Sequence, residues 1–127
     1  MSAGDPRFDT PHWPTDIRVS KDRRTLTVGF QDGPTVTIAA ELLRVESPSA
    51  EVQGHSPTQK QTVPGRRHVG IMTIEPVGNY AVRINFDDMH NTGIFSWAYL
   101  YELGENQHQV WTDYLSALEA QGLSRDP

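Results

Sequence analysis

Cysteine is absent from this sequence of 127 residues. Its absence excludes disulfide bonds, thiolate zinc sites, iron–sulfur ligation by cysteine and cysteine nucleophiles, and it fits a reducing compartment. Long apolar runs are absent as well, and residues 1–5 lack both the basic start and the apolar core of a secretory signal. We therefore expect a cytoplasmic protein that does not bind membranes.

Positive charge is scarce. The chain has eleven Lys and Arg residues against sixteen Asp and Glu residues, a formal net charge of −5. A net negative protein is not steered toward the phosphates of nucleic acids, because their charges repel. We therefore expect no nucleic-acid partner.

Familiar catalytic signatures are missing too. The sequence has no Gly-x-Gly-x-x-Gly dinucleotide loop, no Gly-x-x-x-x-Gly-Lys phosphate loop and no Gly-x-Ser-x-Gly nucleophile elbow. None of its five histidines has an acidic residue two positions later, as the His-x-Asp or His-x-Glu pair of iron oxygenases requires. The sequence thus gives no positive sign of an enzyme.

The length and the 36% hydrophobic content suit one domain with its own core. Residues 1–14 contain three prolines among polar residues, which is typical of a flexible arm. We expect the arm to be followed by a single domain over residues 15–122 and a frayed tail over residues 123–127.

Two stretches of alternating apolar residues predict β-hairpins. In the first, the alternation continues on both sides of a turn at residues 31–33, and in the second a turn at residues 76–79 separates two such runs. The alternating positions are Ile17, Val19, Leu26, Val28, Phe30, Val36 and Ile38, and then Val69, Ile71, Thr73, Tyr80, Val82, Ile84 and Phe86.

Helical patterns surround the second hairpin. Residues 39–44 are rich in Ala and Leu, and residues 47–54 have the signals of one further short turn. Near the end, Ser96 can cap a helix that Gly104 stops, and a second helix begins at Asn106 and ends at Gly122. The sequence predicts an α+β fold, a small antiparallel sheet built from two β-hairpins with two C-terminal helices packed against it.

Three segments carry a resemblance to a known family. They are LRVESPSAEVQGH at residues 43–55, EPVGNYAV at residues 75–82 and FDDMHNTGIFSW at residues 86–97. Together they resemble the DUF971 family, the gamma-butyrobetaine hydroxylase-like N-terminal domain, over roughly residues 15–122. In the hydroxylases this domain precedes an oxygenase domain, so the resemblance implies an accessory, binding or dimer-forming module and no oxygenase chemistry.

The resemblance also implies a metal position. In the hydroxylases the small domain holds zinc through three cysteines and a histidine, and by spacing Ser47, Ser49 and Val52 fall where the cysteines would lie, while His90 corresponds to the histidine. Three of those four ligands are therefore absent from this chain.

A replacement metal site is the sharper of two readings of the nearby polar residues. Glu51, His55 and His90, with Asp88 or Asp87, offer nitrogen and carboxylate ligands that suit iron, manganese or zinc. The other reading is that Glu51 is a solvated helix residue, His55 a loop histidine and His90 a turn residue that bonds backbone groups. The expected cofactor, if one binds, is a transition metal such as iron or zinc.

Other residues indicate a surface for a partner. Arg66 and Arg67 form a basic patch at a strand entrance that suits an acidic partner or an anion, or else a solvated strand end. Tyr99 and Glu102 lie off the apolar stripe of their predicted helix and are further candidates for a partner surface.

The function that follows is a non-catalytic accessory or binding domain that takes a protein partner or a metal ion, with a homodimer left open. The first alternative is a metal-binding protein that assists iron or iron–sulfur metabolism. The second is a small metal- or His-dependent enzyme that uses His55 or His90 as a base with Glu51 or Asp88.

Overall fold

The strands form two three-stranded antiparallel sheets in the computed structural model, which describes residues 13–31 and 33–127. The first sheet contains β1 (Pro14–Val19), β2 (Thr25–Phe30) and β3 (Thr35–Ala39), and the second contains β4 (Ile71–Val77), β5 (Ala81–Phe86) and β6 (Ile94–Ser96). Both predicted hairpins are present as β2–β3 and β4–β5. The predicted flexible arm lies outside the described residues up to residue 12, and Pro14 already begins β1.

Four α-helices complete the fold of the described residues. They are α1 (Ala40–Val45), α2 (Ala50–Gln53), α3 (Trp97–Glu105) and α4 (Gln107–Ala120), and a 3-10 turn covers Pro57–Gln59. The predicted α+β class and the two C-terminal helices are confirmed. Among the described residues, no helix has the length and apolar character needed to cross a membrane.

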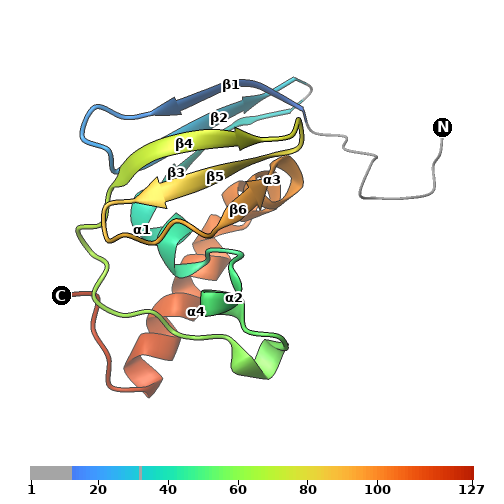
Figure 1. The fold of residues 1–127 in the computed structure, drawn as a ribbon. Helices are drawn as coiled ribbons and strands as arrows, with labels where there is room; N and C mark the ends of the chain where they lie inside the picture. The colour runs from blue at the N-terminus through green and yellow to red at the C-terminus, as the bar shows by residue number, and fades with distance from the viewer. Residues whose placement is uncertain (1–12, 32) are drawn as a thin grey trace.

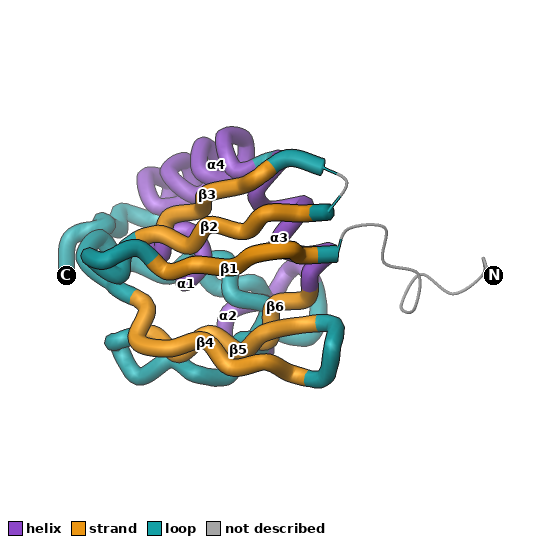
Figure 2. The backbone as a smooth tube through the Cα atoms, turned by 90° about the horizontal axis from the view of Figure 1, so that it is seen from above, coloured by secondary structure: helices purple, strands orange, loops and turns teal. Residues whose placement is uncertain are grey.

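The strands divide into two sheets, although the alternating pattern indicated one. Figures 1 and 2 show the sheets side by side, with β1 and β4 at neighbouring edges. The helices lie below the strands in Figure 1. The contact between the sheets includes the β1–β2 turn, where the backbone N–H of Ile71 donates to the carbonyl of Arg23 over 2.8 Å. Strand β6 has only three residues, too few for an alternating pattern to reveal it.

One apolar core joins the sheets to the helices. The inward positions of β2, β3 and β5 are buried, as the alternation predicts, and α1 is buried on all sides. Helix α3 packs so closely on β3 that a Cβ atom at Gly104 would lie 2.6 Å from Cβ of Val36. This close approach explains why a glycine stands inside a helix, where it otherwise costs stability.

The predicted N-cap of α3 is right, but Gly104 lies inside this helix instead of stopping it, and Asn106 begins α4 without the predicted side-chain cap bond. Ser96 Oγ accepts the backbone N–H of Tyr99 over 3.0 Å, as the cap predicts. Asn106 makes no side-chain cap bond, and its amide N–H donates back to the carbonyl of Glu102 over 2.9 Å. Its expected partner, Gln109, donates instead to Asp113 within the helix over 2.8 Å.

Residues 123–127, which the sequence predicts to fray, make hydrogen bonds to the chain before β4 and to α1. The backbone N–H groups of Gly65 and Arg67 donate to the carbonyls of Ser124 and Arg125 over 2.9 and 3.0 Å. The guanidinium of Arg125 also makes two 2.8 Å bonds to the buried carboxylate of Glu41 and lies 5.0 Å from the ring centre of Trp111. A polar tail is thus held because it neutralises a carboxylate that the core has buried.

Removing this neutralising charge tests the tail contact. Arg125→Met leaves the Glu41 carboxylate buried without its partner. We expect the free energy of unfolding to fall by about 2 kcal/mol, which is less than the cost of breaking a fully buried ion pair because Arg125 is partly exposed. Urea denaturation at neutral pH measures the loss. Arg67→Met is the matched control, since Arg67 pairs with the exposed Asp126 and its loss should cost less than about 1 kcal/mol. Equal losses in the two variants would contradict the interpretation.

The contact between α3 and β3 can be tested at Gly104. A change from glycine to alanine in a helix ordinarily stabilises it by about 1 kcal/mol. Gly104→Ala should instead destabilise the protein by about 1–3 kcal/mol, because the new methyl group overlaps Val36. Thermal denaturation of this variant beside Ser116→Ala, an exposed change in α4, gives the sign. A Gly104→Ala protein more stable than wild type would contradict the packing.

Candidate functional site

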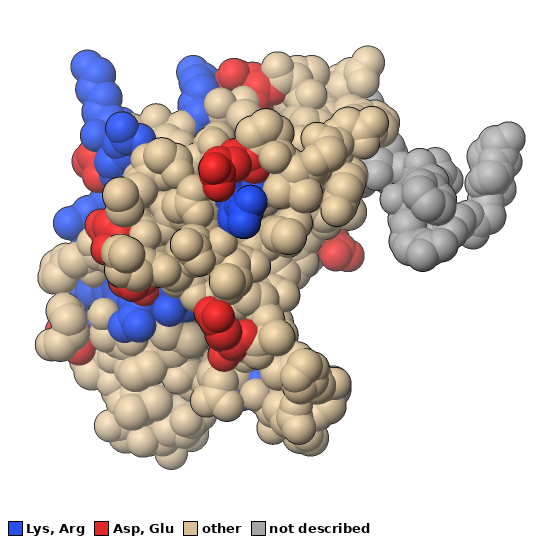
Figure 3. All heavy atoms as spheres, in the orientation of Figure 1, with Lys and Arg blue, Asp and Glu red and all other residues tan. Residues whose placement is uncertain are grey.

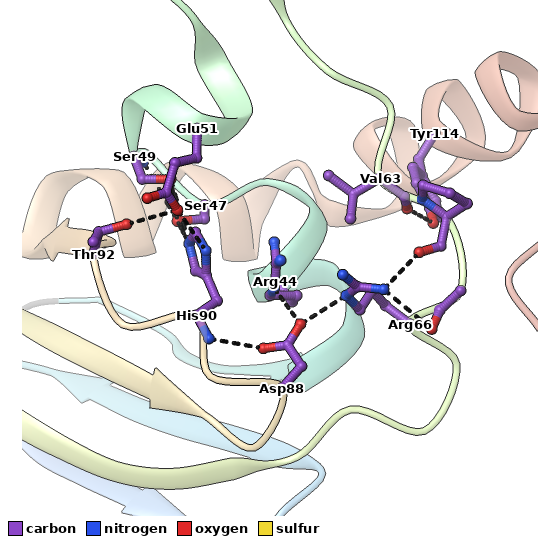
Figure 4. Close-up of polar contacts among 12 residues, drawn as sticks. Arg44, Ser47, Ser49, Glu51, Val63, Arg66, Asp88, His90, Thr92 and Tyr114 are labelled. Atoms are coloured by element: carbon purple, nitrogen blue, oxygen red, sulfur yellow. Dashed lines mark hydrogen bonds and ion pairs between the residues drawn. The ribbon is translucent and has the colours of Figure 1, made fainter. Parts of the chain in front are cut away.

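A buried polar cluster lies where α1, α2 and the β5–β6 connection meet (Figure 4). Ser47 and Ser49 come from the link between α1 and α2, Glu51 from α2, and His90 from the chain between β5 and β6. Ser47, Ser49 and His90 are 0%, 6% and 7% exposed, so three polar side chains are almost fully withdrawn from water. Buried polar groups of this kind must find partners within the protein.

His90 is bonded through both ring nitrogens. Its Nδ1 lies 3.1 Å from Oε1 of Glu51, and its Nε2 lies 2.9 Å from Oγ of Ser47 and 3.3 Å from Oγ of Ser49. An ionised carboxylate can only accept, so Nδ1 carries the proton of the neutral ring and Nε2 accepts from a serine hydroxyl. Thr92 Oγ1 donates to the same oxygen of Glu51 over 3.1 Å.

Apolar groups and backbone close the cluster. The rings of Phe86 and His90 are 6.1 Å apart between centres, and a Cβ atom at Gly93 would lie 2.3 Å from Oγ of Ser47. The backbone at residue 93 therefore passes directly against the serine hydroxyl. Only a glycine allows this approach.

Asp88 and two arginines form a second polar group, which contacts the backbone of His90 (Figure 4). Oδ1 of Asp88 accepts the backbone N–H of His90 over 3.1 Å, which fixes the turn that carries the imidazole. Oδ2 accepts Nε–H of Arg44 over 2.7 Å and lies 2.7 Å from Nε of Arg66. Two guanidinium groups thus share one carboxylate, and Nη1 of Arg44 is buried without a hydrogen-bond partner.

These surroundings shift two pKa values. Burial lowers the pKa of His90, the charge of Arg44 lowers it further, and Glu51 and Asp88 oppose the change only in part. Burial alone would raise the pKa of Asp88, but hydrogen bonds from Arg44 and from the backbone of His90 outweigh it and hold this pKa below its usual value. The site therefore contains a neutral imidazole and an ionised carboxylate at neutral pH.

The structure brings together only part of the predicted metal set. Glu51 and His90 are in contact, and Asp88 bonds the backbone of His90, but its carboxylate is occupied by two arginines. His55 is exposed, and its backbone N–H donates to Gln59. Across residues 13–31 and 33–127, no group of three or more His, Asp or Glu side chains could hold a metal ion.

The predicted partner residues also lie in unlike settings. Arg66 pairs with Asp88 and Arg67 with Asp126, so their positive charges are already partly neutralised and attract an external anion less strongly. Tyr99 is only partly exposed: its hydroxyl donates to the carbonyl of Glu46, and burial raises its pKa to about 12. Of these four predicted residues, only Glu102, in α3, is exposed.

The order Ser47, His90, Glu51 is that of a nucleophile, a base and an orienting carboxylate. The distances of 2.9 and 3.1 Å fall within the range that such a relay needs. A nucleophile must also reach a substrate, and Ser47 is 0% exposed beneath the backbone at Gly93. The arrangement supports a structural hydrogen-bond chain better than it supports acyl transfer.

Residues 17–101 match the family described as gamma-butyrobetaine hydroxylase-like, N-terminal. The chain belongs to this family. The matched range contains the whole of the cluster around His90, so the family resemblance read from three sequence segments is confirmed. None of the curated proteins matches the chain.

Solved structures of similar proteins support the same family and fold. Two NMR solution structures are 45% and 44% identical, cover 97% and 91% of this chain and 91% of their own chains, and have TM-scores of 0.81 and 0.78. A crystal structure from Acidithiobacillus ferrooxidans ATCC 23270, of a DUF971 family protein of unknown function, is 42% identical, covers 72% of this chain and 91% of its own, and has a TM-score of 0.60. Membership of the family defines no activity.

The zinc implied by the hydroxylase resemblance does not fit the residues present. Zinc is held by thiolates, imidazoles and carboxylates. The cysteine positions of the hydroxylases correspond here to two hydroxyls, Ser47 and Ser49, and to the buried hydrocarbon Val52. The Glu51 carboxylate cannot complete the set with Nε2, because it contacts the other ring nitrogen of His90.

Sequence reasoning missed how far the serines and arginines take part in the site. The sequence indicates Ser47 as the start of a short turn and, by the resemblance, Ser47 and Ser49 as positions of absent cysteines, while Arg44 carries no signal because it lies in an Ala- and Leu-rich helix. A basic residue on a helix that is buried on all sides needs an acidic partner, and Asp88 is the partner of Arg44.

The lowered pKa of His90 predicts a pH dependence of stability. The unfolded chain binds a proton near pH 6.5 while the folded chain binds it only at lower pH, so folding stability is complete above about pH 6.5 and falls as the pH decreases toward the folded pKa. Between pH 8 and pH 5, the free energy of unfolding should therefore fall less steeply with decreasing pH for His90→Gln than for wild type. The two slopes should differ by at most about 1.4 kcal/mol per pH unit. Urea denaturation at each pH measures them. His55→Gln, a change at an exposed position, is the matched control. A wild-type slope in His90→Gln would contradict the assignment.

Proposed function

We propose that this chain is a binding domain that docks a basic, partly apolar segment of a protein partner in a groove beside α4. The groove lies between α4 and residues 60–62, and its volume is about 230 Å³. Figure 3 shows the lower edge of the molecule hollowed on the side that carries α2 and α4. This groove is the observation on which the proposal rests.

The walls of the groove are apolar and its rim is polar. Val45, Val110 and Ala117 supply the apolar walls, and the remaining lining comes from Glu46, Lys60, Gln61, Thr62, Asp113 and Tyr114. A concave apolar surface with a few polar groups is the usual form of a specific binding site. The site suits an aliphatic side chain that enters from a partner.

Hydrogen bonds fix the wall opposite α4. Tyr114 donates to the carbonyl of Val63 over 2.6 Å, and Gln121 donates to Thr62 over 2.7 Å, so α4 itself holds this segment. On the other side, the backbone N–H of Gln61 donates to the carbonyl of Val52 over 2.7 Å. A groove that is held open in the free protein spares a ligand the cost of ordering it.

The charges beside the groove favour a basic partner. Helices α3 and α4 contain four acidic residues and no Lys or Arg, and the acidic residues, Glu102, Glu105, Asp113 and Glu119, are all exposed. Within the groove, Lys60 is neutralised by Glu46 over 2.7 Å, which leaves Asp113 to set the sign of the rim. Complementary charge raises the association rate and selects the partner.

A pair of peptides tests the groove directly. A short peptide of alternating Leu and Lys should shift the backbone amide NMR signals of residues 60–62 and 110–117, and the same peptide with Glu in place of Lys should not. Ala117→Trp, which fills the groove, and Asp113→Lys, which reverses its rim charge, should each weaken binding at least about tenfold, equivalent to 1.4 kcal/mol.

Matched variants on the same helix control for general effects. Ala120→Trp and Glu119→Lys introduce the same side chains at exposed positions outside the groove lining and should keep most of the affinity. The proposal is wrong if the Leu/Lys and Leu/Glu peptides bind alike, or if the shifted signals lie elsewhere in the protein.

A further inference from the structure

The atoms around Nε2 of His90 have the spacing of a metal-ligand set. Ser47 Oγ and Ser49 Oγ lie 2.9 and 3.3 Å from Nε2 and 3.4 Å from each other. Ligand atoms about 2 Å from a tetrahedral ion lie about 3.3 Å apart. Behind the ring, Glu51 accepts from Nδ1, as carboxylates do behind metal-bound histidines.

The chemistry of these atoms does not suit a metal. Two serine hydroxyls and one neutral imidazole bring no negative charge, whereas a buried dication needs anionic ligands to repay its lost hydration. The nearest fixed charges include the guanidinium groups of Arg44 and Arg66, which share the single carboxylate of Asp88. The carboxylates of Glu51 and Asp88 balance these two positive charges, so no net negative charge is left to hold a dication at Nε2.

We propose that Ser47, Ser49 and Glu51 hold His90 by hydrogen bonds in a frame that has metal-ligand geometry, so that this chain joins α2 to the β5–β6 connection without a metal. What the frame lacks is anionic ligand atoms, because hydroxyl groups face Nε2. Replacing the two hydroxyls with thiols, and the buried Val52 of α2 with a third cysteine, should turn this frame into a site for a thiolate-binding dication such as zinc or cobalt.

Two features of the cluster support this exchange. Serine and cysteine differ in one atom, so the thiols of Ser47→Cys and Ser49→Cys begin from positions already directed at Nε2. Val52 is 2% exposed, and its backbone N–H donates to the carbonyl of Ser49 over 3.1 Å, which puts it one turn further along the same segment. Each new thiolate would also offset the positive charge of the two arginines.

Cobalt and zinc are the probes for the experiment. Wild type, Ser47→Cys/Ser49→Cys and Ser47→Cys/Ser49→Cys/Val52→Cys are purified without a histidine tag under reducing conditions and titrated with Co²⁺. The triple variant should bind one equivalent, develop thiolate-to-cobalt charge-transfer absorption and melt at a lower temperature once EDTA is added. Wild type should show no such absorption, retain no stoichiometric metal on elemental analysis and melt at the same temperature with and without EDTA.

Controls separate the frame from folding defects. His90→Ala in the triple variant should lose most of the cobalt affinity, and Ser47→Ala/Ser49→Ala should melt below wild type without binding metal. The double cysteine variant changes the least volume and keeps the test valid where the triple variant fails to fold.

Either of two results would overturn the proposal. One is a wild-type protein that retains one equivalent of metal through His90 and loses thermal stability in EDTA. The other is a folded cysteine variant that takes up no cobalt. Both readouts are independent of partner binding, so they stand apart from the outcome of the peptide experiment.

Discussion

The carboxylate of Asp88 joins three segments that are far apart in the sequence. It accepts from Arg44 in α1, pairs with Arg66 in the connection to β4, and fixes the backbone of His90 beyond β5. Met89, beside it, has a φ of 75°, a conformation that a non-glycine residue adopts only when its surroundings hold it. This one ionised group therefore helps to fix the position of His90 and, through it, the contact with α2.

Much of the fold follows from local rules, because alternation and helix caps are local signals. The inward faces of β2, β3 and β5 were predictable from Val, Ile, Leu and Phe at every second position, and Ser96 was predictable as a cap. The two-sheet arrangement was not, since it depends on a three-residue strand and on a contact between Arg23 and Ile71. The contacts of the tail were not predictable, because Arg125 bonds to Glu41, which lies 84 positions away in the chain.

The candidate site was predictable in position and not in chemistry. The family resemblance correctly brought residues 47–55 and 86–97 together, and the Glu51–His90 contact followed from it. It could not show that His55 faces away or that two arginines occupy Asp88, because both depend on side-chain directions set by the whole core. Tyr99 illustrates the same limit, since a residue off the apolar stripe found a buried carbonyl at Glu46.

The three tryptophans lie in different environments, so their intrinsic fluorescence can report on different parts of the protein. Trp97 is 9% exposed and donates its indole N–H to the carbonyl of Asn79 over 2.9 Å, so its emission reports the second sheet. Trp111 lies beneath the guanidinium of Arg125, and Trp13 is 42% exposed at the entrance to β1. Release of the tail alters mainly the surroundings of Trp111. Fluorescence quenching can therefore distinguish local opening of the tail from unfolding of the whole domain without any added label.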